Sequence, residues 1–245
     1  MTYMNDVTLL MADTARTRAY LDALDHAGLR FDHAILVCDP ERPRWGQISH
    51  IKMNGPEFSG LRQPNLGIDP QAVMERICGA VTVLDAGSVN SPEVVRILQA
   101  QAPRMTIFSG FGGELVRPLT LAAAGQMLHL HAGWLPDFRG STTLYYSYLA
   151  EGTMGVSAIL LSEEIDAGAI LLRKRYPPPP PGTDVDYIYD SAMRADALLE
   201  ALKGYDSQRG CFAHDASVDP NDGARTYYIV HPLLKHIALT ALNHD

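Results

Sequence analysis

Short apolar runs that alternate with helical repeats are the main feature of this chain. Residues 7–11 form an apolar run with little polar alternation, which is typical of a strand buried on both faces of a parallel sheet. In the segment that follows, apolar residues recur at helical spacing until Gly28 ends the repeat. Residues 33–37 form a second apolar run. This order of strand, helix and strand predicts an α/β fold with right-handed crossovers.

The alternation resumes at residue 70, after an irregular segment. Residues 38–69 are interrupted by prolines and glycines and show no periodicity, and a loop of this length in a compact domain is usually functional. The remaining pattern predicts helices at 70–79, 92–101, 120–124, 143–150 and 184–204, strands at 81–84, 105–109, 126–131, 155–162, 169–176 and 227–230, and a last helix after Pro232.

Composition and charge narrow the class of protein. Of 245 residues, 47% are apolar and 20% are charged, which is ordinary for a globular enzyme and excludes a collagen-like or disordered chain. The 28 acidic residues exceed the 20 basic ones, which argues against a nucleic-acid partner bound through its phosphates. No run approaches the ~18 apolar residues of a membrane span, and the first residues lack a basic leader. We therefore expect a cytoplasmic protein with no membrane partner.

Two histidines at the end of one expected strand are the strongest candidates for chemistry. His129 and His131 stand at positions i and i+2, so they point to the same face of the strand. A single histidine there is usually a packed, hydrogen-bonded residue. A pair at the carboxyl end of a parallel strand, followed by the glycine- and proline-containing loop 133–140, instead indicates a ligand site.

Two further loops are candidates on weaker grounds. Asp166-Ala167-Gly168 leads from one expected strand into the next, and on spacing alone it is best explained as a turn aspartate that bonds its own backbone. The glycine loop at residues 108–114 contains Gly-x-Gly but lacks the third glycine of a dinucleotide-binding fingerprint. A backbone donor loop that approaches a flat or anionic ligand remains possible there.

These motifs together resemble the folate-dependent formyltransferase family. The family's signature runs Asn-x-His, Leu-Leu-Pro, an aromatic residue, often Arg-Gly, and later Asp-x-Gly. This chain has the same order and similar spacing over about residues 80 to 200. It departs at His129, which stands where the family carries asparagine. The matching motifs are His129-Leu130-His131, Trp134-Leu135-Pro136, Phe138-Arg139-Gly140 and Asp166-Ala167-Gly168.

The resemblance implies a fold, a reaction and a set of site residues. The fold would be a Rossmann-like, mostly parallel twisted sheet with helices on both faces, with a catalytic domain at 1–204 and a short C-terminal extension at 205–245 packed on it. The donor would be 10-formyltetrahydrofolate, and the catalytic residues His129, His131 and Asp166. Asp166 would favour a protonated histidine and accept the proton of the amine. The donor site would use Phe111, Gly112, Gly113, Leu115, Ser162, Glu163 and Glu164.

The acceptor is expected to be a small-molecule amine, such as an amino sugar, an amino acid or a natural-product intermediate. Only about forty residues follow the long expected helix, whereas methionyl-tRNA members of the family carry an extra C-terminal domain, and the deformylases carry an N-terminal one. Arg139 could hold an acceptor carboxylate or phosphate, or form a structural salt bridge. Trp134 could stack on a flat ligand or pack in the core. The chain could form a homodimer.

Two alternatives stay open at the level of the sequence. His129, His131 and Asp166 are two imidazoles and one carboxylate, a set that can hold Zn or Fe(II), so a hydrolase or lyase-type enzyme on the same fold is the second hypothesis. A non-catalytic small-molecule binding module is the third.

Overall fold

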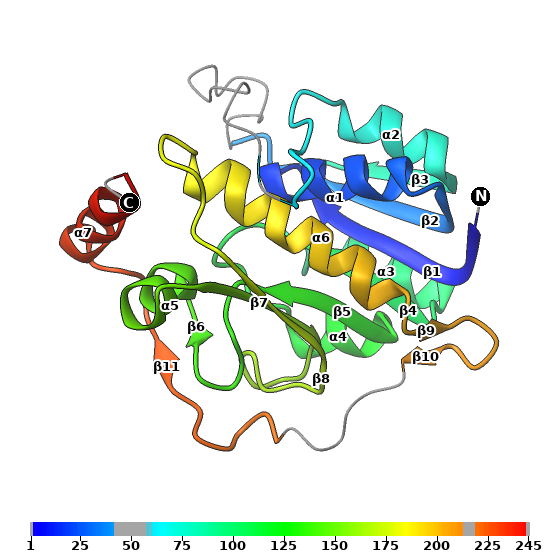
Figure 1. Cartoon of the computed structure of the whole chain (residues 1–245). Helices are drawn as coiled ribbons and strands as arrows, with labels where there is room; N and C mark the ends of the chain where they lie inside the picture. Colours follow the sequence, from blue (N-terminus) through cyan, green and yellow to red (C-terminus); the bar gives the residue numbers. More distant parts are fainter. Residues whose placement is uncertain (1, 42–57, 59, 213–218, 244–245) are drawn as a thin grey trace.

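A seven-stranded sheet forms the centre of the molecule (Figure 1), and its strand order is β3-β2-β1-β4-β5-β7-β8. The computed structural model describes residues 2–41, 58, 60–212 and 219–243. Neighbouring strands from β3 to β5 run parallel, and β7 and β8 are antiparallel to their neighbours. The strands are β1 (Thr2–Ala12), β2 (Leu29–Val37), β3 (Cys78–Leu84), β4 (Met105–Ser109), β5 (Gln126–His131), β7 (Met154–Leu160) and β8 (Ile170–Tyr176).

The side chains of β1 alternate between two apolar cores, one on each face of the sheet. Leu9 and Met11 belong to one apolar core, and Leu10 and Ala12 belong to a second core on the opposite face. All four side chains are fully buried. A run with little polar alternation is therefore expected in this strand, as the sequence predicted.

Helices cover both faces of the sheet (Figure 1). On one face, α1 (Ala15–His26) packs against both α2 (Pro70–Ile77) and α6 (Asp190–Leu202). On the other face, α3 (Pro92–Gln101) packs against α4 (Pro118–Ala123). The expected Rossmann-like sheet with helices on both faces is confirmed.

The residues after α6 form short elements attached to the edge of this body. A small hairpin joins β9 (Tyr205–Asp206) to β10 (Cys211–Phe212). Further on, β11 (Thr226–Tyr227) pairs in parallel with β6 (Arg139–Gly140), and α7 (Pro232–Leu242) lies next to α5 (Thr143–Glu151) (Figure 1). Whether 205–245 is an extension of a domain that ends at 204 stays a prediction.

Two expected elements differ from those in the structure. The helix expected at 184–204 begins with a π-helical turn, Val185–Tyr189, because the amides of Ile188 and Tyr189 both donate to the carbonyl of Asp184. The strand expected at 227–230 is only Thr226–Tyr227, because the chain turns away after it and the Val230 amide donates to Thr142 Oγ1. Within the described ranges, no helix combines the length and apolarity that crossing a bilayer requires.

Candidate active site

The two predicted histidines lie at the carboxyl end of β5, the edge at which parallel α/β sheets place their ligand sites. His131 is 5% exposed, whereas His129 is only partly buried. The ring of His129 lies 5.8 Å, between centroids, from the ring of Phe108 at the end of β4. The ends of two neighbouring strands therefore meet at this site.

The ring of His131 lies between two oxygen atoms. Its Nε2 is 2.7 Å from the carbonyl oxygen of Phe138, and its Nδ1 is 3.4 Å from Oδ2 of Asp166. Because a carbonyl oxygen only accepts hydrogen bonds, the proton of a neutral ring is held on Nε2 and the lone pair of Nδ1 faces the carboxylate. Burial lowers the pKa of His131, although Asp166 and the Phe138 carbonyl act in the opposite direction. The His131–Asp166 pair is therefore a neutral ring beside a carboxylate, and it can accept a proton.

Backbone geometry brings Asp166 to the histidine. Asp166 has a positive φ of 51°, and its Oδ2 accepts a hydrogen bond of 3.0 Å from the amide of Gly140, 26 residues earlier. A β-carbon on Gly168 would lie 1.6 Å from the carbonyl oxygen of Leu160, so only glycine allows the chain to re-enter the sheet here. The carboxylate of the Asp-x-Gly turn thus reaches another loop instead of serving only its own turn.

A cavity of about 140 Å³ adjoins this pair and contains most of the predicted donor-site residues. Two segments form its walls: residues 114–116, which follow β4, and residues 161–166, which follow β7. Sequence reasoning placed six lining residues here: Leu115, His129, Ser162, Glu163, Glu164 and Asp166. It missed five. Glu114, Val116, Leu161 and Ile165 adjoin predicted residues in the sequence, and Phe108 is the first residue of the glycine loop.

Three predicted donor-site residues lie apart from this cavity. Phe111 is 6% exposed and packs in the apolar core beneath α3 and α4. Gly112 and Gly113 are exposed, and a β-carbon on either would meet nothing within 4 Å. Gly112 and Gly113 therefore leave open space at the surface and are not among the residues that line the cavity.

His129 lines the cavity, and its two ring nitrogens differ. Nδ1 is buried with no hydrogen-bond partner among the described residues, whereas Nε2 is not among the buried atoms that lack a partner. Burial lowers the pKa of His129 well below 6.5, and the positive charges of Arg16 and Arg194 lower this pKa further. As expected, Asp166 favours the protonated form of His131, but burial outweighs the carboxylate and the net pKa of that ring is lowered.

Two partly buried arginines complete the electrostatics of the site, and sequence reasoning missed both. Arg16, in the first turn of α1, donates to Ser109 Oγ at 3.2 Å and to the Gly110 carbonyl at 2.5 Å. Arg194, on α6, is held by an ion pair with Asp190 at 2.9 Å. Neither had a sequence signal, because a charged residue on an amphipathic helix usually faces solvent.

The two predicted acceptor residues have protein partners in this structure. Nη2 of Arg139 donates to the carbonyl of Pro220 at 2.5 Å and to Oδ1 of Asn221 at 3.0 Å. The ring of Trp134 is covered by the guanidinium groups of Arg173 and Arg175, at 4.7 and 4.3 Å from its centroid. Neither residue is part of the wall of the 140 Å³ cavity.

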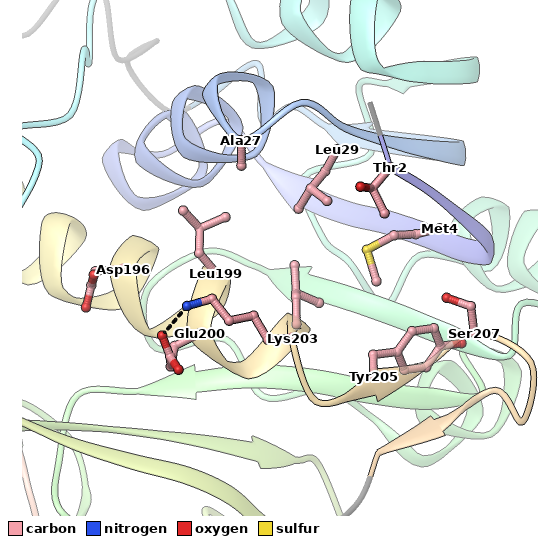
Figure 2. Close-up of a pocket in the computed structure, with 11 residues that line it drawn as sticks. Thr2, Met4, Ala27, Leu29, Asp196, Leu199, Glu200, Lys203, Tyr205 and Ser207 are labelled. Atoms are coloured by element: carbon pink, nitrogen blue, oxygen red, sulfur yellow. Dashed lines mark hydrogen bonds and ion pairs between the residues drawn. The ribbon is translucent and has the colours of Figure 1, made fainter.

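A larger cavity of about 530 Å³ lies at the opposite edge of the sheet (Figure 2). It is lined by the first residues of β1 and β2, Thr2, Met4 and Leu29, and by the end of α6, where Lys203 pairs with Glu200. This is the amino end of the parallel strands, far from the two histidines. We therefore do not assign this cavity to the candidate active site.

A metal centre is not favoured by the arrangement. Among the residues that the structure describes, no group of three or more His, Cys, Asp or Glu side chains is placed to hold a metal ion. His131 Nε2 is engaged with the Phe138 carbonyl, which leaves that ring only one nitrogen toward Asp166.

Comparison with known proteins agrees with this geometry. Residues 4–199 match the family described as Formyl transferase. Over 208 residues the chain is 28% identical to a methionyl-tRNA formyltransferase of Synechococcus sp. (strain JA-3-3Ab), with 84% of this chain and 57% of the relative covered. The chain spans about half the length of the curated relatives it matches.

Solved structures share the fold at low sequence identity. HypX from Aquifex aeolicus in complex with tetrahydrofolic acid superposes with a TM-score of 0.57 at 14% identity, covering 98% of this chain and 34% of HypX. A sugar N-formyltransferase from a Shewanella species superposes with a TM-score of 0.55 at 17% identity, covering 96% and 87%. On the match to residues 4–199, the chain belongs to the formyl transferase family.

Proposed function

We propose that this protein transfers a formyl group from 10-formyltetrahydrofolate to an amine of a small-molecule acceptor. The observation that carries the proposal is the contact of 3.4 Å between His131 and Asp166 beside a cavity that His129 also lines. When bound, the folate would supply an electrophilic formyl carbon.

His129 would act on the formyl oxygen. A buried N–H without an acceptor is less tolerated than a buried lone pair, so the neutral ring carries its proton on Nε2, which is not among the buried atoms that lack a partner. This N–H would donate to the oxygen on which negative charge develops. In other enzymes, one such donor lowers the activation free energy by about 3 kcal/mol. It would do what the family's asparagine amide does, in the place where this chain has histidine.

His131 and Asp166 would take the proton that the attacking amine loses as its nitrogen bonds to the formyl carbon. They would return this proton to the folate nitrogen as its bond to the formyl carbon breaks, so that the products are the formamide and tetrahydrofolate. The Nδ1 lone pair and the carboxylate face each other, so a proton that arrives there is shared between them. The Phe138 carbonyl holds the opposite edge of the ring and keeps Nδ1 turned toward the carboxylate.

The cavity fits one end of a folate. Its walls combine apolar side chains such as Phe108, Val116 and Leu161 with polar groups of the 162–166 loop, the composition expected of a site for a flat heterocycle. Its volume of about 140 Å³ is below the roughly 300 Å³ of pockets that enclose a whole drug-sized ligand. We therefore infer that it receives the ring system while the rest of the donor extends outward along residues 112–115.

The choice of a small acceptor rests on charge. The net charge of −8 opposes the approach of a polyanion such as tRNA, whereas it does not hinder a small amine. The names of related proteins include both tRNA and sugar acceptors, so the acceptor class is our inference. A cytoplasmic location and a homodimer stay predictions.

Calorimetry and an acceptor screen test the function. We expect 10-formyltetrahydrofolate, 5-formyltetrahydrofolate and tetrahydrofolate to bind and to raise the melting temperature through mass action. We then expect formyl transfer to at least one amino sugar or amino acid. If none of the three folates binds, the proposed donor is refuted. Release of formate with every amine would indicate hydrolysis. Transfer to tRNA alone would refute the small-molecule acceptor.

A further inference from the structure

A segment outside the family match lies against the loop that carries the catalytic contacts. We call residues 219–230 the C-terminal strap. The family match ends at residue 199, and the strap returns to pair β11 with β6. Three backbone hydrogen bonds of 3.0 to 3.4 Å join residues 136–141 to residues 225–227. The strap therefore holds the loop that follows the two histidines.

That loop supplies two of the contacts that orient the His131–Asp166 pair, one to each side chain. The carbonyl of Phe138 accepts from Nε2 of His131, and the amide of Gly140 donates to Oδ2 of Asp166. The two groups are two residues apart in one short stretch of backbone. A shift of this stretch would alter the histidine tautomer and the position of the carboxylate together.

An aromatic stack fixes the strap to this stretch. The ring of Tyr227 lies 5.4 Å from the ring of Phe138, at an interplanar angle of 20°, and 4.6 Å from the ring of Tyr146 on α5. Stacked aromatic pairs contribute beyond their buried area. The next residue, Tyr228, is 80% exposed, so the two adjacent tyrosines differ sharply in their surroundings.

The close approach of the two backbones requires a glycine. Gly140 has a φ of +104°, and a β-carbon on it would lie 2.1 Å from the carbonyl oxygen of Tyr227. Arg139 adds a side-chain anchor, because its Nη2 donates to the Pro220 carbonyl and to Asn221. The strap is thus attached to the loop through rings, backbone and one guanidinium.

We propose that Tyr227 is a positioning residue, which through the stack and β11 holds Phe138 and Gly140 where they orient His131 and Asp166. It touches neither the cavity wall nor the reacting atoms, so it acts only through the loop. The catalytic meaning of this role rests on the proposed function. The structural claim does not, since it concerns the state of His131 in the free protein.

Nitrogen-15 NMR of the histidine side chains tests the proposal without any ligand. In the wild type we expect His131 to show the signals of a single Nε2–H tautomer. In Tyr227→Leu we expect a mixture of tautomers and a changed titration of His131, whereas Tyr227→Phe restores the wild-type signals, because the ring and not the hydroxyl makes the stack. Tyr228→Leu is the matched control and should leave His131 unchanged.

Kinetics provide the second readout, with the amine found in the acceptor screen. We expect Tyr227→Leu to lower kcat by about 10- to 100-fold, as for a misplacement of catalytic groups of about 1 Å, with the KM for the folate unchanged. If Tyr227→Leu does not fold, Tyr146→Leu removes the other face of the stack and is read in the same way. Wild-type tautomer signals in the folded variant would overturn the proposal. Absence of folate binding would overturn the function alone.

Discussion

The guanidinium Nη1 of Arg194 donates a hydrogen bond of 2.5 Å to the carbonyl of Leu130, the residue between the two site histidines. The same guanidinium is paired with Asp190, and each of the two side chains is 13% exposed. Helix α6 is thus attached to β5 by this hydrogen bond, and the ion pair within the helix holds the guanidinium in place. This contact ties the position of both histidines to the packing of a helix that follows them by some sixty residues.

Breaking this ion pair should cost much more stability than breaking an exposed one. In Arg194→Leu the carboxylate of Asp190 stays buried without a partner, and we expect the free energy of unfolding to fall by about 3 to 5 kcal/mol. Arg209→Leu removes a pair with Asp206 whose arginine is 81% exposed, and should cost less than about 1 kcal/mol. Urea denaturation of both variants checks this, and equal losses would contradict it.

Replacing Asp166 by asparagine should stop turnover while the folate still binds. Asp166→Asn keeps the shape of the side chain and removes the proton acceptor, so we expect kcat to fall by about 100- to 10,000-fold. The folate Kd should change by less than about threefold, since the cavity walls are kept. Asp137→Asn, at an exposed position of the loop after β5, is the control. Retained turnover in Asp166→Asn would rule out the assigned role.

Stability should decrease as the pH falls below about 6.5, because the fold holds two histidines in neutral form. The pKa of His129 and that of His131 are both lowered, so at mildly acid pH the unfolded chain binds protons that the folded chain does not. Each ring then contributes a slope of at most about 1.4 kcal/mol per pH unit. We expect a shallower slope in His129→Asn, measured by chemical denaturation between pH 5 and pH 7.5. An unchanged slope would show that His129 titrates normally.

Adding one methyl group at Gly168 should disrupt the turn that carries Asp166. Its β-carbon would lie 1.6 Å from the Leu160 carbonyl oxygen, so Gly168→Ala must displace backbone. We expect a loss of about 3 kcal/mol or more in the free energy of unfolding. Gly112→Ala is the matched control, because a β-carbon there meets nothing within 4 Å and should change stability by less than about 1 kcal/mol. Thermal and urea unfolding compare the two.

The sequence by itself determined the strands and the face on which the histidines lie. The strands expected at 105–109 and 126–131 coincide with β4 and β5, because strands buried on both faces are rich in apolar residues and can be recognised by them. The alternation of side chains along a strand puts His129 and His131 on one side wherever β5 is located in the sheet. The order of the motifs from His129 to Gly168 also sufficed to indicate the family, which the comparison confirms.

Only the tertiary structure decided how these residues interact. Asp166 meets His131 from 35 positions away, and the cavity excludes Phe111, which the sequence placed at the donor site. The same holds for the burial of His129 and for the charges of Arg16 and Arg194, which together lower the pKa of this ring, and for the strap that holds Phe138. Periodicity is a property of a few neighbouring residues, whereas desolvation and charge–charge contacts arise when distant segments pack together. A pattern along the chain therefore predicts elements and faces, but not the protonation of a buried ring.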